Sequence, residues 1–255
     1  MKGILEYVNS LQANQGKCTQ STMMHEPQPL AEYGLDTVEC AICHNTGTLV
    51  REDENGCRIG SECACMAKRR SLRRISRSGL SDAVRRNTFG SYQTPDDKRV
   101  GIKAAAERFC ADTSGSWFFI AGSPGSGKSH ICTGIAGELL TRSEVRYMLW
   151  RDDAVKIKAA VMDRDAYAEM IEPLKAVPVL YIDDFLKGKV GEADVNLAFE
   201  IINARYLDSR KRTIISSERT LPEIMTIDEA IGSRIYERAK SFILAAPSEN
   251  WRMRT

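Results

Sequence analysis

The feature that most constrains this 255-residue sequence is a glycine-rich segment at residues 122–129, which reads GSPGSGKS. It fits the phosphate-binding pattern G-x-x-x-x-G-K-[ST] at every fixed position. The apolar run at 117–121 predicts a buried strand before the loop, and residues 131–140 predict a helix after it. In this order, backbone N–H groups and the helix N-terminus can surround phosphate oxygens. A flexible Gly/Ser surface loop lacks that context, so the segment predicts a nucleoside-triphosphate site.

The polar residues of this loop have predicted roles in holding the triphosphate. Lys128 supplies a mobile cation, and the Ser129 hydroxyl is expected to bind a Mg²⁺ ion that bridges the phosphates. The cofactors predicted here are therefore ATP and Mg²⁺. The predicted nucleotide-binding residues are Gly122, Ser123, Pro124, Gly125, Ser126, Gly127, Lys128, Ser129 and His130.

A second acidic motif follows at residues 179–184, where the apolar run VLYI ends in Asp183 and Asp184. It lies 55 residues beyond Lys128 and resembles the Walker B strand of P-loop ATPases. We expect Asp183 to hold Mg²⁺, directly or through water, and Asp184 to orient the attacking water. Paired acids are common at turns, but a strand that ends this way after a phosphate loop favours a hydrolytic site.

The order of predicted elements indicates an α/β fold in three layers, because strands and helices alternate from residue 97 onward. The predicted strands lie at 117–121, 145–150, 177–182, 213–217 and 242–245. The predicted helices lie at 97–110, 131–140, 152–175, 193–209, 221–225 and 228–239. A short helix at 4–11 and a linker to residue 38 precede them, and Phe89 and Tyr92 in the loop at 87–95 are candidates to pack near a nucleotide base.

Composition is that of a globular protein, with 43% hydrophobic and 27% charged residues. No stretch approaches the roughly 18 apolar residues of a membrane span, so we expect no membrane partner. The first residues lack the apolar core of a signal peptide, and the expected location is cytoplasmic.

A basic block occupies residues 66–86, where eight Lys and Arg residues face one acid and give a net charge of +7. The whole chain carries only +2, so the remainder is about −5. Such a block can meet nucleic-acid phosphates or an acidic protein surface, and a solvated connecting helix is an equally good interpretation.

Four cysteines form a candidate metal site, because Cys40 and Cys43 are separated from Cys63 and Cys65 by 19 residues. Close pairs at this distance are typical of structural Zn²⁺ sites, and turns at 45–47 and 54–56 suit a small hairpin between them. The second pair has one intervening residue instead of two, so Cys57 and His44 remain alternative fourth ligands. Free thiols or a disulfide are the other interpretation.

The ordered motifs resemble those of the AAA+ ATPases of the DnaC/DnaI helicase-loader group. The similarity rests on the phosphate loop, YIDDF at 181–185, TIISSE at 213–218 and IGSRI at 231–235, and it covers most of residues 39–251. The cysteine module also looks like the zinc-bearing segment of DnaI-like and phage-type loaders. The resemblance implies an AAA+ P-loop fold with a small N-terminal zinc module and no full C-terminal lid.

The resemblance also implies roles for single residues. Ser217 stands in the place of sensor 1, which reads the γ-phosphate, while Glu218 departs from the pattern because an anion near phosphate is unfavourable unless it contacts water or a cation. Arg234 matches the arginine finger that acts on a neighbouring subunit's site, with Arg238 as a competing candidate. Asp184 stands where the wider superfamily has Glu, so we expect slow, regulated hydrolysis. A sensor 2 arginine is doubtful.

The segment 152–175 occupies the position at which related initiators carry a helical element that faces DNA. Lys156, Lys158 and Lys175 are candidates to meet phosphates there. An ordinary cover helix that buries Val155, Ala159 and Met162 is an equally good interpretation.

The resemblance predicts an ATP-dependent loader that places a hexameric DnaB-type helicase on single-stranded DNA and self-associates through its ATPase domains. The predicted domains are a helicase-interaction module at 1–66, a basic linker at 67–86 and the ATPase domain at 87–255. The alternatives are an IstB-type transposition accessory ATPase and a zinc-containing DNA-binding ATP switch without loading activity. A P-loop small-molecule kinase is a further alternative, for which no acceptor pocket or arginine-rich lid is identifiable.

Overall fold

The computed structural model describes residues 40–52, 57–250 and 253, and the helix and linker expected before residue 39 lie outside these ranges. The chain divides into two compact units, Met1–Arg69 and Arg70–Thr255. The domain limits predicted at residues 66 and 86 stay a prediction. Helix α2 (Cys65–Ser78) contains the boundary between the two units and carries much of the basic block.

The first unit contains a β-hairpin of two antiparallel strands, β1 (Thr48–Glu52) and β2 (Arg58–Glu62), in which Val50 lies opposite Gly60. The expected turn at 54–56 lies outside the described residues. Every residue of β2 is exposed. The buried side chains described in this unit are Cys43, Cys63 and Arg69, so the described part lacks an apolar core of its own.

The second unit is built on a five-stranded parallel sheet in the order β4-β5-β6-β3-β7. Its strands are β3 (Phe118–Ala121), β4 (Val145–Leu149), β5 (Val179–Asp183), β6 (Arg212–Ser217) and β7 (Ile243–Ala245). Strand β6 lies between β3, which leads into the phosphate loop, and β5, which ends in Asp183. The carboxyl ends of these three strands therefore meet at one edge, which is where open α/β sheets bind ligands.

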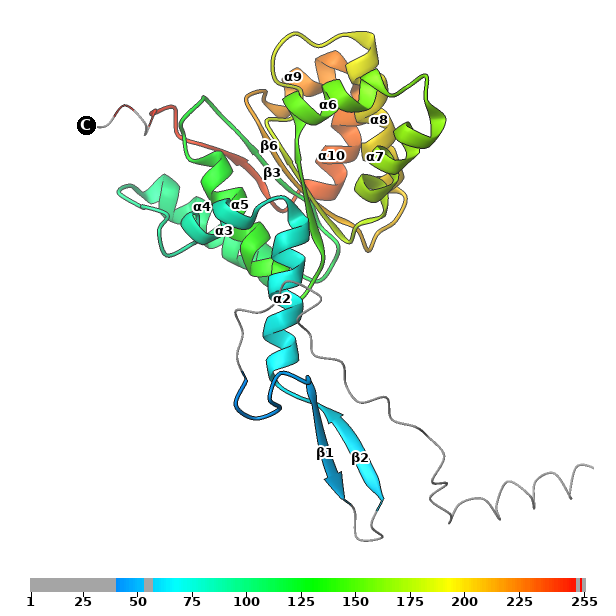
Figure 1. The fold of residues 1–255 in the computed structure, drawn as a ribbon. Coiled ribbons are helices and arrows are strands. Elements are labelled where there is room, and N and C mark those ends of the chain that lie inside the picture. The colour runs from blue at the N-terminus through cyan, green and yellow to red at the C-terminus, as the bar shows by residue number, and fades with distance from the viewer. Residues whose placement is uncertain (1–39, 53–56, 251–252, 254–255) are drawn as a thin grey trace, which may run out of the picture. The chain divides into compact units, whose positions relative to one another are not determined.

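Helices cover both faces of this sheet, as Figure 1 shows with α4 and α5 on one face and α8, α9 and α10 on the other. The helices with their bounds are α3 (Ser81–Arg86), α4 (Asp97–Ala111), α5 (Lys128–Leu140), α6 (Trp150–Ala159), α7 (Arg164–Ala176), α8 (Glu192–Tyr206), α9 (Leu221–Ile227) and α10 (Glu229–Ala239). The three-layer α/β architecture predicted from the alternating elements is confirmed.

Strand β3 shows why these strands are nearly continuous apolar runs. Phe118 and Ile120 pack with α4 and α5, whereas Phe119 and Ala121 pack with the helices of the opposite face. Successive side chains of a strand point to opposite faces, and both faces of a parallel sheet with helices on each side are buried. All four residues of β3 are buried.

The prediction of which side chains are buried in the helical segment after β4 was wrong. Val155 is 61% exposed and Met162 is 95% exposed, and Ala159 is also exposed. The buried residues of α6 are Trp150, Ala154 and Ile157. The buried face of the helix therefore begins at Trp150, the last residue of the strand predicted at 145–150. A turn at 160–163 separates α6 from α7 within the helical segment that was predicted at 152–175.

The lysines of this segment that were candidates for DNA contact are paired with carboxylates. Lys158 bonds Asp194 on α8, Lys175 bonds Glu172 and Glu200, and Lys156 lies 3.4 Å from Asp153. Lys158 and Lys175 thus hold α6 and α7 against α8. In this arrangement they contribute to packing between helices, which leaves Lys156 as the most exposed of the three.

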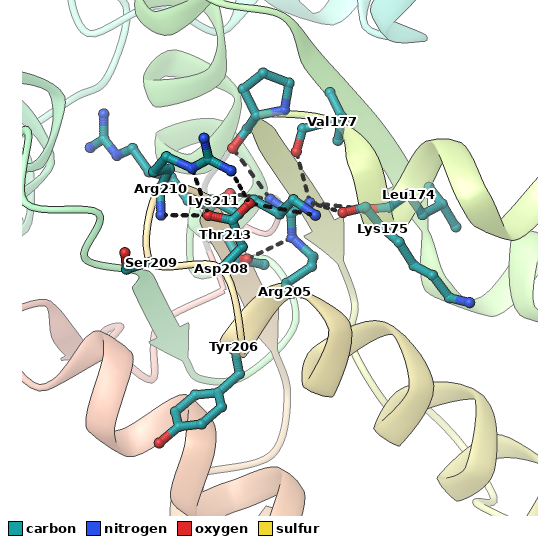
Figure 2. Close-up of polar contacts among 12 residues, drawn as sticks. Leu174, Lys175, Val177, Arg205, Tyr206, Asp208, Ser209, Arg210, Lys211 and Thr213 are labelled. Carbon is teal, nitrogen blue, oxygen red and sulfur yellow. Dashed lines mark hydrogen bonds and ion pairs between the residues drawn. The ribbon is translucent and has the colours of Figure 1, made fainter.

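A buried arginine holds together the amino ends of β5 and β6, at the end of the sheet opposite the phosphate loop. Figure 2 shows its contacts. Arg205 at the end of α8 is fully buried and donates 3.0 Å to Thr213 Oγ1. It also donates to five backbone carbonyl oxygens, those of Leu174, Lys175, Val177, Pro178 and Arg212. Burial lowers the pKa of Arg205 to about 9. One side chain therefore joins α8 to the starts of β5 and β6.

Among the described residues, no helix is both long and apolar enough to cross a membrane.

Candidate functional site

The phosphate loop lies between β3 and α5 with the backbone shape that its glycines allow. Gly125 and Gly127 have φ angles of 75° and 90°, a region that other residues rarely adopt. A Cβ atom at Gly125 would lie 1.9 Å from Asn250 Oδ1. Helix α5 begins at Lys128, directly after the loop and three residues earlier than the sequence predicted. Its N-terminus therefore points into the site, as phosphate binding requires.

Lys128 is buried at the base of this loop, and its ammonium donates 2.7 Å to the Gly122 carbonyl and 2.8 Å to that of Ser123. Burial lowers the pKa of Lys128, and the nearby carboxylates of Asp184 and Glu218 oppose the shift. An ammonium that is bonded only to loop carbonyls and lies near acids is placed to take phosphate oxygens as partners. The residues present thus fit a polyphosphate.

A cavity of about 350 Å³ opens beside the loop and has the size of an ordinary small-ligand pocket. Besides residues 124–130 of the loop, its walls are formed by Asn87, Ser91, Tyr92, Gln93, Arg99, Asp184, Lys187 and Glu218. The predicted nucleotide-binding residue His130 lies here, with its ring edge-on to Tyr92 at 5.4 Å between centroids. Burial lowers the pKa of His130, so a neutral ring faces the cavity.

The two candidate base-binding aromatics occupy different places. Tyr92 lines the cavity beside Gly127, where a Cβ atom would lie 3.3 Å from its ring. Phe89 packs on the backbone of α5 at Gly134 instead, so it does not line the cavity. The sequence placed the two residues in one loop and had no signal to separate them.

The residues assigned to Mg²⁺ lie in contact. Ser129 Oγ donates 3.0 Å to Asp183 Oδ1 at the end of β5. The same carboxylate accepts hydrogen bonds from the hydroxyls of Ser216 and of Tyr147, the latter at 3.3 Å. Sequence reasoning missed Ser216 and Tyr147, because only the order of the strands brings β4 and β6 to this carboxylate. The arrangement is an oxygen-rich corner next to the phosphate loop, which suits a hard cation.

Asp184 lines the cavity, with its carboxylate aimed at Lys187. Its φ angle of 56° is in the left-handed region, and its N–H donates 3.1 Å to Ser216 Oγ. Lys187 Nζ lies 3.0 Å from Asp184 Oδ2 and 2.8 Å from Glu218 Oε1. Sequence analysis did not single out Lys187.

The structure places Ser217 away from the cavity, contrary to its predicted role as sensor 1. Its side chain is fully buried, and its hydroxyl donates 2.8 Å to the Phe185 carbonyl. Successive residues of a strand point to opposite faces, so Ser216 reaches Asp183 while Ser217 turns inward. Glu218 at the strand end lines the cavity in its place.

Arg234 does not line the cavity of its own chain. It lies on α10, where its guanidinium donates 3.1 Å to Asn203 Oδ1 and 2.8 Å to the Ala230 carbonyl. The guanidinium also lies 5.1 Å from the Phe199 ring and 5.4 Å from the Tyr206 ring. This position is compatible with action on a neighbouring subunit, and that role stays a prediction.

The first unit gathers the four predicted zinc ligands. The sulfur atoms of Cys40, Cys43, Cys63 and Cys65 all lie within 4.8 Å of one another. The Cys43–Cys65 and Cys40–Cys63 sulfur distances are 3.5 and 3.8 Å. A tetrahedral Zn²⁺ with Zn–S bonds of about 2.3 Å separates its sulfurs by about 3.8 Å. The residues present therefore fit Zn²⁺, and the alternative ligands Cys57 and His44 are not part of the cluster.

The local backbone explains how these sulfurs converge. His44 and Asn45 have φ angles of 46° and 69°, which turns the chain sharply after Cys43. The Gly47 N–H then donates 3.3 Å to Cys43 Sγ. Hydrogen bonds of this kind hold a thiolate in place beside a metal.

Comparison with known proteins gives one family match and several relatives. The model of the bacterial DnaA ATPase domain matches residues 84–239. The phage-like element PBSX protein XkdC of Bacillus subtilis (strain 168) is 31% identical in an alignment of 231 residues that covers 84% of this chain and 84% of XkdC.

Two solved structures resemble about two thirds of this chain. The crystal structure of the DnaC helicase loader matches with a TM-score of 0.57 at 18% identity, over 65% of this chain and 99% of that one. The replication initiator DnaA bound to AMPPCP and single-stranded DNA matches with a TM-score of 0.54 at 23% identity, over 64% of this chain and 50% of that one. At these identities the two structures support the fold alone.

Proposed function

The chain belongs to the family of bacterial DnaA ATPase domains, and from that premise we propose that it loads a ring-shaped replicative helicase onto single-stranded DNA. As a member of this family it is an AAA+ ATPase related to replication proteins. The observation that carries the proposal is the pairing of a cavity beside the phosphate loop with a four-cysteine module in one chain. That pairing matches the DnaI-like and phage-type loaders that the sequence resembles.

Within this proposal, ATP occupies the cavity beside the phosphate loop. Residues 122–130 hold the phosphates, Ser129 and Asp183 hold Mg²⁺, and Asp184 orients the attacking water. The contact between Ser129 and Asp183 supports this assignment. Arg234 completes the site of a neighbouring subunit, so that ATP holds adjacent chains together on DNA.

The four cysteines hold Zn²⁺ in a module that binds a DnaB-type helicase. Zn²⁺ supplies a structural crosslink there, and the helicase contact is a separate property of the surface that it orders. The basic block is the candidate surface for DNA phosphates. Some of its residues are already engaged, because Arg74 donates 2.6 Å to the carbonyl of Leu140 at the end of α5, and Arg69 donates 2.7 Å to Asn45 Oδ1.

Native mass measurement of the full chain with candidate helicases tests the proposal. With ATP we expect a complex with a helicase hexamer, and with the Lys128→Ala variant we expect that complex to weaken. Lys189→Ala is the matched control, because Lys189 is exposed after β5 and does not line the cavity. Absence of a helicase complex with folded, zinc-loaded protein contradicts the loader. A complex with a transposase instead favours the IstB-type alternative.

A loading assay then separates a loader from a DNA-binding ATP switch. The wild-type chain is expected to allow the helicase to unwind a fork whose single strand is covered with binding protein. ATP-dependent binding to single-stranded DNA without any gain in unwinding would favour the switch.

A further inference from the structure

Lys187 bridges two carboxylates at the wall of the nucleotide cavity. Its ammonium lies 2.8 Å from Glu218 Oε1 and 3.0 Å from Asp184 Oδ2, and all three residues line the cavity. The hydrogen bond to Glu218 contributes most to raising the pKa of Lys187, so the side chain is charged at neutral pH. Lys187 therefore adds a further cation to a cavity that Lys128 and Arg99 also line.

The backbone under Lys187 is held firmly. Asp184 and Leu186 have φ angles of 56° and 54°, in the left-handed region that residues other than glycine rarely adopt. Arg219 donates 2.9 Å to the carbonyl of Leu186 and 2.7 Å to that of Gly188. Strained positions that are fixed by their surroundings are typical of functional sites. The loop is thus fixed, while the long side chain of Lys187 is able to change partners.

Charge explains why a cation is needed at this position. Glu218 stands at the strand end where related ATPases have a polar residue, and a carboxylate beside a phosphate is repulsive unless a cation lies between them. The charges of Asp184, Glu218 and Lys187 all act on the pKa of Lys128 at the base of the phosphate loop. The pair of Lys187 and Glu218 therefore lies within electrostatic reach of the phosphate-binding lysine.

We propose that Lys187 reads the terminal phosphate of the bound nucleoside triphosphate within its own chain. Glu218 holds the ammonium at the cavity wall, and a phosphate oxygen replaces Asp184 as its second partner. The exchange leaves the Asp184 carboxylate free to accept a hydrogen bond from water. Lys187 and Glu218 together take the place that the sequence assigned to Ser217. The inference rests on the ATPase site and is independent of helicase loading.

Binding of AMPPCP and of ADP, each with Mg²⁺, to the full-length Lys187→Met variant tests the proposal by calorimetry. A lost charged hydrogen bond is worth about 1.5–3 kcal/mol, so affinity for AMPPCP is expected to fall about tenfold or more. ADP lacks the terminal phosphate, and its affinity is expected to change less than about threefold. Lys189→Met is the matched control and leaves both affinities unchanged. Equal losses for the two nucleotides, or no loss, overturn the proposal.

The double variant Lys187→Met/Glu218→Gln separates contact with phosphate from simple neutralisation of Glu218. If Lys187 touches the phosphate, removing the acid does not restore AMPPCP affinity, whereas full recovery overturns the proposal. Should Lys187→Met unfold, as its melting curve would show, Lys187→Gln takes its place in the same measurements. AMPPCP affinity is again expected to fall relative to ADP affinity, and an unchanged ratio of the two affinities contradicts the role of Lys187.

Discussion

At the residue scale, Arg234 and Arg238 show how one helix turn separates two different uses of the same side chain. Both lie on α10. The Arg238 guanidinium lies 5.5 Å from the Trp117 ring and donates to four backbone carbonyl oxygens, those of Gly115, Tyr206, Ser209 and Lys211, at 2.7 to 3.4 Å. Arg234 has one carbonyl of its own helix and one amide oxygen as partners. Arg238 is therefore committed to the fold, and Arg234 remains the finger candidate.

Alanine is expected to lower mainly the stability at position 238 and mainly the rate of ATP hydrolysis at position 234. Arg238→Ala removes the donor from carbonyls that are mostly partly buried, and we expect it to lower the free energy of unfolding by about 1–3 kcal/mol. Arg234→Ala is expected to cost less than about 1 kcal/mol, yet to reduce assembly-dependent hydrolysis by a factor on the order of 10³. Chemical denaturation and phosphate release measure the two effects.

Mixed subunits give the control for the Arg234 prediction. Arg234→Ala subunits keep their own ATP site, and Asp184→Asn subunits keep their arginine, so a mixture is expected to regain part of the lost hydrolysis. If the mixture stays inactive while both proteins assemble, Arg234 does not act on a neighbour. If Arg238→Ala is as stable as wild type, its structural role is wrong.

At the element scale, Arg205 replaces what would otherwise be several separate contacts between α8 and the starts of β5 and β6. The same helix carries Asn203, which bonds Arg234. A helix that is secured at its end by a buried guanidinium therefore also positions the finger candidate. Because the partners of Arg205 are carbonyl oxygens and one hydroxyl, burial of its charge is balanced by dipoles and not by a carboxylate.

Substitution of Arg205 is expected to be among the most destabilising changes in the sheet. Arg205→Met removes all the hydrogen bonds that Arg205 donates to these carbonyls, and we expect a loss of about 3–5 kcal/mol in the free energy of unfolding. Arg205→Lys keeps a charge but provides fewer donors and should fall between Met and wild type. Arg210→Met is the control, because Arg210 is exposed and pairs only with Asp208, so we expect its stability to stay close to that of wild type. Equal stability of the Arg205 and Arg210 variants in urea titrations contradicts this account.

The elements also show where sequence reasoning succeeds. Strands β3 and β5 and the loop between β3 and α5 were predicted because motif and apolar run coincide there. The prediction of the buried face of α6 was wrong because two candidate faces of a short helix differ by a shift of only one residue. The helix also begins at Trp150, earlier than the sequence predicted. The Lys187–Glu218 contact was not predictable, since it depends on left-handed backbone at Asp184 and Leu186 that no local pattern encodes.

At the scale of the whole molecule, the two units differ in what holds them together. The unit that follows residue 69 has large apolar clusters on both faces of its sheet. In the described part of the first unit, the apolar side chains that are buried belong to Cys43 and Cys63, while Ile42, Val50 and Ile59 are exposed. A unit this small without an apolar core generally needs a crosslink or a metal. Its stability should therefore depend on Zn²⁺ and not on packing.

Removal of zinc from the full chain is expected to unfold the first unit alone. Binding of zinc to four thiolates contributes about 10 kcal/mol or more to folding, so chelation should remove amide-exchange protection from residues 40–69. Exchange in β3, β5 and β6, and ADP binding after Mg²⁺ is restored, should not change. Cys65→Ser should lose zinc, whereas Cys57→Ser, outside the cluster, should keep about one ion per chain. Unchanged exchange at 40–69 after chelation, or zinc retained by Cys65→Ser, would contradict a four-cysteine structural site.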